Sequence, residues 1–214
     1  MSKAQSPVKT GGKPPLALIA GPTASGKSDL AVKLGQSIAD AGLRAVVINA
    51  DSQQVYRDLR VLSARPSERD MGGIEHRLFG TWDGATPCSA AEWAAAAKRE
   101  IAALHAEGAV PILCGGTGLY MRTLLDGISP VPAIDSAIRE EVRRFSAAEL
   151  REHLKREDPA AAARLGENDV QRMSRALEVV RSTGQSLTQW QNRSEGGIGG
   201  EVSLFPVVLL PERE

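Results

Sequence analysis

The chain has 214 residues, a length that suits one sizeable domain with a smaller partner, and its 26 Lys and Arg residues are balanced by 26 Asp and Glu residues. This balance produces no net field of the kind that by itself indicates a nucleic-acid partner. The two cysteines, Cys88 and Cys114, lie far apart in the sequence, which argues against a zinc site and against a disulfide framework.

The N-terminal residues are rich in Lys, Ser, Gly and Pro and lack the apolar stretch of a secretory signal. No later run approaches the length that spans a bilayer. We therefore expect a disordered leader, residues 1–14, on a soluble cytoplasmic protein that has no membrane partner.

A β-turn-helix-β unit is predicted directly after this leader. Residues 16–20 are a short apolar strand, and Gly21–Ser28 ("GPTASGKS") match the phosphate-binding pattern G-x-x-x-x-G-K-[ST]. Residues 27–41 carry apolar side chains at helical spacing, and 45–50 ("AVVINA") are apolar on both faces, as a covered parallel strand requires. We call Gly21–Ser28 the phosphate loop.

The residues of the phosphate loop have distinct chemical uses. Its glycines let the backbone approach phosphates, Lys27 neutralises their charge, and the Ser28 hydroxyl suits a bound magnesium ion. Thr23 adds a second hydroxyl inside the loop. Such a loop holds the diphosphate of a nucleotide or of another molecule, so it does not identify the substrate.

Two further polar junctions are expected at the same edge of the sheet. Asp51 follows the second strand, where it is a candidate base or metal partner, or simply a residue that stabilises a turn. A capping box at 89–92 opens a helix to about residue 107, and a third strand, 110–114, ends in Gly115-Gly116-Thr117. Residues 51–86 are predicted to be mostly loop, with an edge strand near Leu78 and Phe79.

After the Pro-containing linker at 129–132, the sequence becomes rich in charged residues and its pattern is typical of helices. Start signals occur at Asp135, at the capping box 146–149, at Asp158-Pro159 and at Asn168 or Asp169. The last of these helices is predicted to bury Val170, Met173, Leu177 and Val180, and to end at Gly184. The arginines of the whole helical region, when read alone, favour a solvated, ion-paired face; they include Arg139, Arg143, Arg144, Arg172 and Arg175.

The predicted fold class is therefore α/β, a phosphate-loop NTPase-like parallel sheet flanked by helices, with an inserted helical subdomain. We expect the core at 15–128, the helical insertion at 129–195, and a strand within 201–214 that returns to the sheet. The strand-like run itself covers 204–210 ("LFPVVLL").

Taken together, the three junctions resemble one family, the tRNA dimethylallyltransferases, also called tRNA isopentenyltransferases. The similarity rests on "GPTASGKS" at 21–28, "DSQQVYR" at 51–57 and "GGTGLY" at 115–120, and it continues through "HRL" at 76–78, "SAAE" at 89–92 and "NDVQRMSRALEV" at 168–179. The resemblance implies transfer of a dimethylallyl group from dimethylallyl diphosphate to the exocyclic amine of the adenine on the 3′ side of the anticodon. Members of the family usually continue well past the position of Glu214, so we expect the C-terminal part of their core to be absent.

The same resemblance implies roles for individual residues. Asp51 is the expected general base, with Thr23 and Lys27 as the other catalytic residues and Ser28 as the ligand of a Mg²⁺ cofactor. The expected diphosphate-binding residues are Gly21, Pro22, Thr23, Ala24, Ser25, Gly26, Lys27 and Ser28. The expected tRNA-binding residues are Asp51, Ser52, Gln53, Gln54, Thr117, Arg139, Gln171, Arg172, Met173, Ser174 and Arg175. The expected partners of a monomeric chain are the tRNA anticodon stem-loop and dimethylallyl diphosphate.

Two other functions remain open from the sequence. A small-molecule or nucleotide kinase would use the phosphate loop on ATP and would not need RNA. A truncated RNA-binding module would bind tRNA without turnover.

Overall fold

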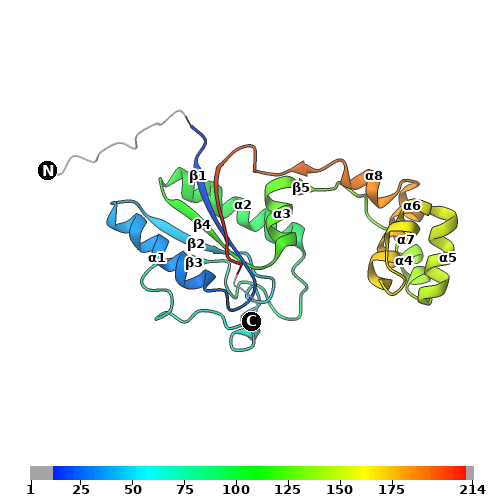
Figure 1. Ribbon diagram of the computed structural model, residues 1–214, viewed down its shortest axis with the longest axis horizontal. Coiled ribbons are helices and arrows are strands. Elements are labelled where there is room, and N and C mark those ends of the chain that lie inside the picture. Colours follow the sequence, from blue (N-terminus) through cyan, green and yellow to red (C-terminus); the bar gives the residue numbers. More distant parts are fainter. Residues whose placement is uncertain (1–11, 211–214) are drawn as a thin grey trace. The chain divides into compact units, whose positions relative to one another are not determined.

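The computed structural model describes residues 12–210, so most of the predicted leader lies outside the described residues (Figure 1). The chain divides into two compact units. The sheet unit comprises the residues up to Asp126 together with those from Gly197 onward, and the helical unit is Gly127–Gly196. Each unit is described by itself.

The sheet unit contains a five-stranded sheet with the order β3-β2-β4-β1-β7, in which every strand pair is parallel. Its strands are β1 (Pro15–Ala20), β2 (Ala45–Asn49), β3 (Glu75–Arg77), β4 (Val110–Gly115) and β7 (Ser203–Val208). In the register Ala20 lies opposite Gly115, and Asn49 lies opposite Cys114. The carboxyl ends of β1, β2 and β4 therefore meet at one edge, which is where open α/β sheets bind ligands.

Helices cover both faces of the sheet because the central strands alternate apolar side chains between the faces (Figure 1). Ala17, Ile19 and Val47 pack with helix α1 (Lys27–Asp40). Leu16, Leu18 and Leu113 pack on the other side with α2 (Ala90–Ala106) and α3 (Gly118–Asp126). The predicted α/β class with a parallel sheet is confirmed.

The outer strand β7 differs from the central strands. It pairs with β1 over all six residues, from Pro15↔Ser203 to Ala20↔Val208. Its side chains are far more exposed, with Phe205 at 59% and Val208 at 59%. An apolar strand surface is thus left open to solvent at this side of the sheet.

An edge strand is present next to the position predicted near Leu78 and Phe79, but it ends before both of these residues. The strand at this position, β3, is Glu75–Arg77, and a 3-10 turn (Arg57–Leu59) lies in the loop before it. Leu78 has a φ of 62°, a left-handed backbone conformation that a strand does not accommodate. The chain therefore turns away at Leu78 and returns towards the Asp51 segment.

The helical unit contains five helices and a short antiparallel ribbon within its described residues. These are α4 (Ser136–Val142), α5 (Ala147–Glu157), α6 (Pro159–Arg164), α7 (Val170–Thr183), α8 (Leu187–Gln191), β5 (Gly127–Ile128) and β6 (Glu195–Gly196). The predicted caps at Asp135, Ser146, Asp158 and Asp169 are all confirmed by side-chain hydrogen bonds. Gly184 ends α7 with a φ of 69°.

The core of the helical unit is built from the apolar faces of α5 and α7. Leu150, Leu154, Met173 and Leu177 are fully buried in it. Val170 was predicted to belong to this apolar stripe, but it is 43% exposed because it occupies the first position of α7, ahead of the packed turns. Across residues 12–210, no helix combines the length and the apolar character needed to traverse a bilayer.

Candidate active site

The phosphate loop connects β1 to α1 and is shaped by two left-handed residues. Ala24 has a φ of 61° and Gly26 a φ of 83°, and Gly26 is the N-cap of α1. A helix N-terminus preceded by such a turn is a site for anions, because its first N–H groups have no partner within the helix. The Lys27 Nζ atom donates a hydrogen bond to the carbonyl of Pro22 at 2.6 Å, so the cation of the loop is held by the loop itself.

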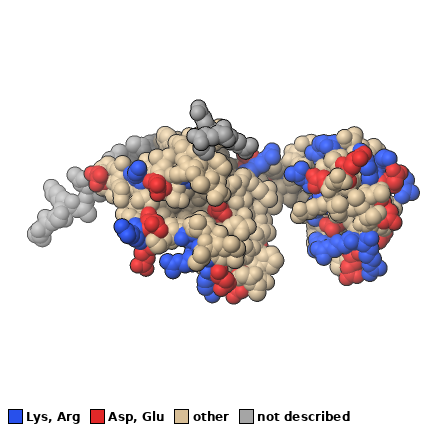
Figure 2. Space-filling model, turned by 60° about the horizontal axis from the view of Figure 1, so that its bottom comes forward, with Lys and Arg blue, Asp and Glu red and all other residues tan. Residues whose placement is uncertain are grey.

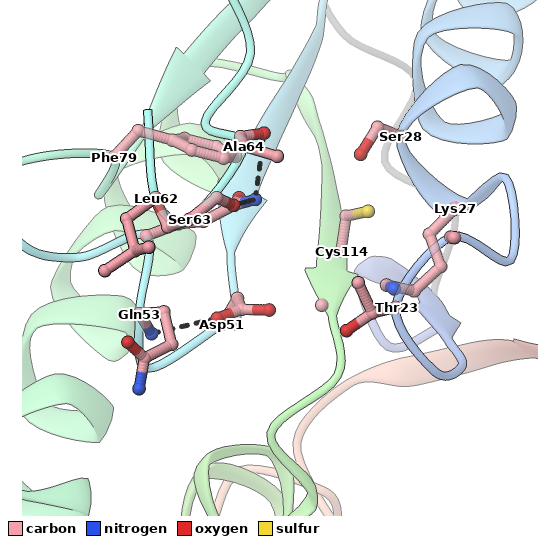
Figure 3. A pocket seen from close by; sticks show the side chains of 13 residues that line it. Thr23, Lys27, Ser28, Asp51, Gln53, Leu62, Ser63, Ala64, Phe79 and Cys114 are labelled. Carbon is pink, nitrogen blue, oxygen red and sulfur yellow. Dashed lines mark hydrogen bonds between the residues drawn. The ribbon is translucent and has the colours of Figure 1, made fainter. Parts of the chain in front are cut away.

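Asp51 begins a turn that follows β2, and this turn, Asp51–Gln54, is called the Asp51 turn below. The backbone N–H of Gln53 donates to Asp51 Oδ1 at 2.9 Å. Figure 3 shows the other carboxylate oxygen directed across the pocket towards the side on which Thr23 and Lys27 lie. One oxygen of Asp51 therefore stabilises the turn, as one interpretation predicted, and the other faces the pocket.

The third junction, Gly115-Gly116-Thr117 at the end of β4, lies against the backbone of the other two, which follow β1 and β2. A Cβ atom on Gly115 would lie 2.2 Å from the backbone of Ala50, and a Cβ atom on Gly116 would lie 3.1 Å from the carbonyl oxygen of Gly21. The Thr117 backbone N–H donates to the Ala50 carbonyl at 3.1 Å. Glycine is thus required at 115 because the backbone after β2 passes directly against it.

A cavity of about 250 Å³ lies where the three junctions converge (Figure 3). On one side are the phosphate-loop side chains, and on the other are Asp51 and Gln53, with the floor formed by β4. The complete lining is Thr23, Ala24, Lys27, Ser28, Asp51, Gln53, Gln54, Leu62, Ser63, Ala64, Phe79, Cys114 and Gly115. A carboxylate and an ammonium group thus face a common space that also has apolar walls.

Cys114 lines the floor of this cavity as a neutral thiol. Burial raises its pKa to about 11, with the nearby Lys27 opposing the shift and Asp51 adding to it. The thiol is therefore a weak nucleophile at neutral pH, because only the thiolate reacts readily.

Four of the eight predicted diphosphate-binding residues line the cavity, namely Thr23, Ala24, Lys27 and Ser28. The other four, Gly21, Pro22, Ser25 and Gly26, do not line it and form the turn itself. Of the residues expected to bind tRNA, Asp51, Gln53 and Gln54 line the cavity. Ser52 and Thr117 bond to each other beside it, the Ser52 N–H donating to Thr117 Oγ1 at 2.9 Å.

The remaining tRNA predictions lie in the helical unit, with Arg139 on α4 and the run from Gln171 to Arg175 on α7. Arg172 forms an ion pair with Asp169 at 3.1 Å and Arg175 one with Glu178 at 3.8 Å. Figure 2 shows side chains of both signs interspersed over the visible face of this unit. Met173 is 0% exposed, so we correct its predicted tRNA contact to a packing role.

Several lining residues were missed by sequence reasoning. Leu62, Ser63 and Ala64 come from the long loop after β2, and Phe79 comes from the segment after β3. Gln54 joins these segments, because its amide donates to the Ser63 carbonyl at 3.0 Å. A sequence signal existed only for Cys114, which directly precedes the Gly-Gly-Thr junction.

No group of three or more His, Cys, Asp or Glu side chains is placed to hold a metal ion within the described part of the chain. The side-chain oxygen groups at the cavity are the Thr23, Ser28 and Ser63 hydroxyls, the Asp51 carboxylate and the amide oxygens of Gln53 and Gln54. Hard divalent cations prefer oxygen ligands of this kind, and Mg²⁺ usually combines one or two of them with phosphate oxygens and water.

Comparisons with known proteins point to one family. A family model described as IPP transferase matches residues 54–214. A curated tRNA dimethylallyltransferase of Erythrobacter litoralis is 61% identical over 210 residues, covering 98% of this chain and 66% of the relative. One of Novosphingobium aromaticivorans is 61% identical over 175 residues, covering 82% of this chain and 62% of the relative. The chain thus spans 62–66% of the length of these relatives.

Solved structures of similarly named enzymes share the fold of this chain. The crystal structure of a eukaryotic dimethylallyltransferase acting on tRNA matches with a TM-score of 0.76 at 24% identity, covering 92% of this chain and 48% of that one. A full-length tRNA isopentenylpyrophosphate transferase of Bacillus halodurans matches with a TM-score of 0.53 at 32% identity, covering 81% and 57%. The family model covers more than half of the chain, and the relatives extend the match through the phosphate loop. The chain therefore belongs to the IPP transferase family.

Proposed function

We propose that this chain carries the active site of a tRNA dimethylallyltransferase, which moves a dimethylallyl group from dimethylallyl diphosphate to the exocyclic amine of the adenine on the 3′ side of the anticodon. The observation that carries the proposal is the placement of Asp51 across one cavity from Thr23 and Lys27 of the phosphate loop. A base that faces a diphosphate-binding loop fits alkylation of an amine by a diphosphate ester.

Each side of the cavity has a separate task in this reaction. The allylic C–O bond breaks, and the electron pair leaves with the diphosphate, whose growing negative charge Lys27 and the loop hydroxyls stabilise. The amine nitrogen forms the new C–N bond and gives its proton to the free oxygen of Asp51. Base catalysis of this kind is worth roughly 10² to 10⁴ in rate.

The oxygen groups at the cavity fit a magnesium ion as cofactor. Ser28 would hold it together with diphosphate oxygens, in keeping with the usual preference of Mg²⁺ for phosphates and few protein ligands. When bound, Mg²⁺ would neutralise part of the leaving-group charge.

The acceptor is an unpaired base, because only a loop nucleotide is easily extruded into an enclosed site. We propose that Ser52, Gln53, Gln54 and Thr117 help to place the adenine. The helical insertion, taken as 129–195, would bind the anticodon stem-loop of tRNA through Arg139, Gln171, Arg172, Ser174 and Arg175. The chain would act as a monomer, with its core at 15–128 and a returning strand within 201–214.

The test incubates the purified chain with labelled dimethylallyl diphosphate, Mg²⁺ and an unmodified tRNA that has adenine next to the anticodon. We expect label to reach the tRNA with the native chain and not with Asp51→Asn. Phosphate transfer from ATP without prenylation would instead identify a kinase. Binding of tRNA without turnover would identify an RNA-binding module.

A further inference from the structure

Asn49 is a buried polar residue at the end of β2 that none of the steps above uses. It is 0% exposed, and its side chain forms three hydrogen bonds. Its Oδ1 atom accepts from the backbone N–H of Asp51 at 2.9 Å, and its Nδ2 atom donates to the carbonyl of Asp51 at 3.0 Å and to that of Leu78 at 3.1 Å. One side chain therefore satisfies both backbone polar groups of Asp51.

These bonds connect two segments that line the cavity. Asp51 starts the turn on one segment, and Leu78 directly precedes Phe79 on the other. Leu78 has a φ of 62°, which costs free energy for a residue other than glycine and persists only where the surroundings impose it. The hydrogen bond from Asn49 is one of the contacts that hold this conformation.

The backbone of Asn49 is itself firmly placed. Its carbonyl accepts from Trp93 Nε1 at 2.9 Å, and Trp93 is fully buried. The Trp93 ring stacks on Tyr120 with 4.6 Å between the ring centroids. Asn49 therefore connects the rigid interface of β2 and α2 with the main chain that carries the candidate base.

We propose that Asn49 is a positioning residue for Asp51, a role that rests on the function proposed above. The three bonds of Asn49 are called the Asn49 clamp below. Two of them fix the main chain of Asp51 and the third holds Leu78, while the Gln53 N–H fixes one carboxylate oxygen of Asp51. The remaining oxygen can then point in only a narrow range of directions into the cavity. A displacement of a catalytic group by about 1 Å costs about 10²-fold in rate, so the clamp bears directly on kcat.

A matched pair of variants tests this role. Asn49→Ala removes all three bonds, whereas Asn49→Ser returns an oxygen that can accept from the N–H two residues ahead. We expect Asn49→Ala to lower kcat by about 10²-fold and Asn49→Ser to recover most of that loss. Because the phosphate loop is untouched, the Kd of inorganic pyrophosphate and the KM for dimethylallyl diphosphate should not change in either variant.

A control variant distinguishes a loss of kcat that comes from a misplaced Asp51 from one that comes from lower stability of the fold. Leu104→Ala opens a cavity in the same core, far from the clamp in sequence, at a residue that is 0% exposed. It should lower the Tm and leave kcat near the native value at a temperature where the protein is folded. The proposal is overturned if Leu104→Ala loses as much kcat as Asn49→Ala, or if Asn49→Ser shows no recovery.

A second measurement does not depend on turnover. Amide hydrogen exchange followed by NMR should become about tenfold faster at Asp51 in Asn49→Ala and stay near native in Asn49→Ser. The Ala50 amide, which donates to the Cys114 carbonyl at 2.8 Å, is the internal reference and should keep its protection. Unchanged exchange at Asp51 in Asn49→Ala would overturn the clamp. A native chain that transfers no prenyl group would refute the proposed function alone, because the exchange result still decides the clamp.

Discussion

The phosphate loop and the Asp51 turn face the same cavity but are held in opposite ways. The Asp51 turn is bonded on all sides, through Asn49, Gln53 and the Ser52–Thr117 pair. The phosphate loop instead bonds to itself through Lys27, and among residues 12–210 the buried hydroxyl of Ser25 has no hydrogen-bond partner. A buried polar group without a partner is costly and calls for an explanation.

This difference indicates which half of the candidate site already has a fixed conformation before a ligand binds. Under the proposed function, the side that carries Asp51 is pre-organised by the fold, so little is lost in ordering it when an acceptor binds. The phosphate loop would be completed by its ligand, because a bound diphosphate would draw Lys27 away from the Pro22 carbonyl and give anionic acceptors to donors in the loop. Substitutions on each side of the cavity test that division.

The largest effect is expected on the base side. Asp51→Asn keeps the shape of the side chain and removes its ability to take a proton, so kcat for prenyl transfer should fall by roughly 10² to 10⁴. Isothermal titration with inorganic pyrophosphate should give a native Kd, since Asp51 lies across the cavity from the loop. An equal loss of pyrophosphate affinity would show that the two sides are not separate.

On the phosphate side, Lys27→Met removes the cation and keeps an unbranched apolar chain. Hydrogen bonds to charged groups are worth about 1.5–3 kcal/mol, so the Kd of pyrophosphate should rise about 10- to 100-fold. Thermal unfolding without ligand should change little, because the partner that Lys27 loses is only the carbonyl of its own loop. A large drop in Tm without ligand would show that this bond stabilises the fold.

The close approach of Gly115 to the Ala50 backbone predicts that a larger residue at 115 lowers the stability of the fold. Gly115→Ala would place a Cβ atom 2.2 Å from the Ala50 backbone, and overpacking of this kind costs about 1–3 kcal/mol. Gly118→Ala is the matched control, because nothing lies within 4 Å of a Cβ atom there. Urea unfolding should separate the two variants clearly, and equal midpoints would contradict the close approach.

A smaller effect is expected at Ser25. Ser25→Ala removes a buried hydroxyl that bonds to nothing in the described part of the chain, so the free energy of unfolding should stay the same or rise slightly. If the hydroxyl finds its partner on the diphosphate, pyrophosphate binding should weaken by about threefold to tenfold, as for one neutral hydrogen bond. Titration and urea unfolding of the same variant measure both quantities, and unchanged binding would leave the buried hydroxyl without this explanation.

The smallest effect at neutral pH concerns Cys114. Its pKa is raised by burial from an ordinary value of 9.0 to about 11, so the folded chain keeps a proton that the unfolded chain releases. The stability that this thiol contributes is present below about pH 9 and is lost as the pH rises towards 11. Thermal unfolding of Cys114→Ala should show a weaker loss of stability over that range than the native chain, and an identical loss would contradict the assignment.

The sequence predicted that the main residues of the candidate site share one edge of the sheet, because these residues follow strands. The phosphate loop, Asp51 and Gly115 each directly succeed an apolar run, and parallel strands bring such positions to one edge. The wall formed by Leu62, Ser63 and Phe79 was not predictable, because it comes from a loop that has no periodicity. Its position depends on bonds from Gln54 and Asn49, which no local pattern indicates.

Met173 shows how two kinds of sequence argument differ. Its spacing on α7 predicted a buried stripe, while the resemblance implied a tRNA contact. Its complete burial with Leu177 supports the spacing, because periodicity reports directly on packing. Positions carried over from a family indicate where a segment lies, and they do not show which side chain of that segment is exposed.

The outer strand β7 has a consequence for how the protein behaves in concentrated solution. Phe205 and Val208 present apolar surface along a strand that, within the described residues, pairs only with β1, and an unpaired strand edge favours pairing with other polypeptides. Pro206 limits that tendency, since proline offers no N–H group to an incoming strand. Substitution of Pro206 should thus affect solubility more than catalysis. The Pro206→Val variant should form aggregates at a lower protein concentration than the native chain.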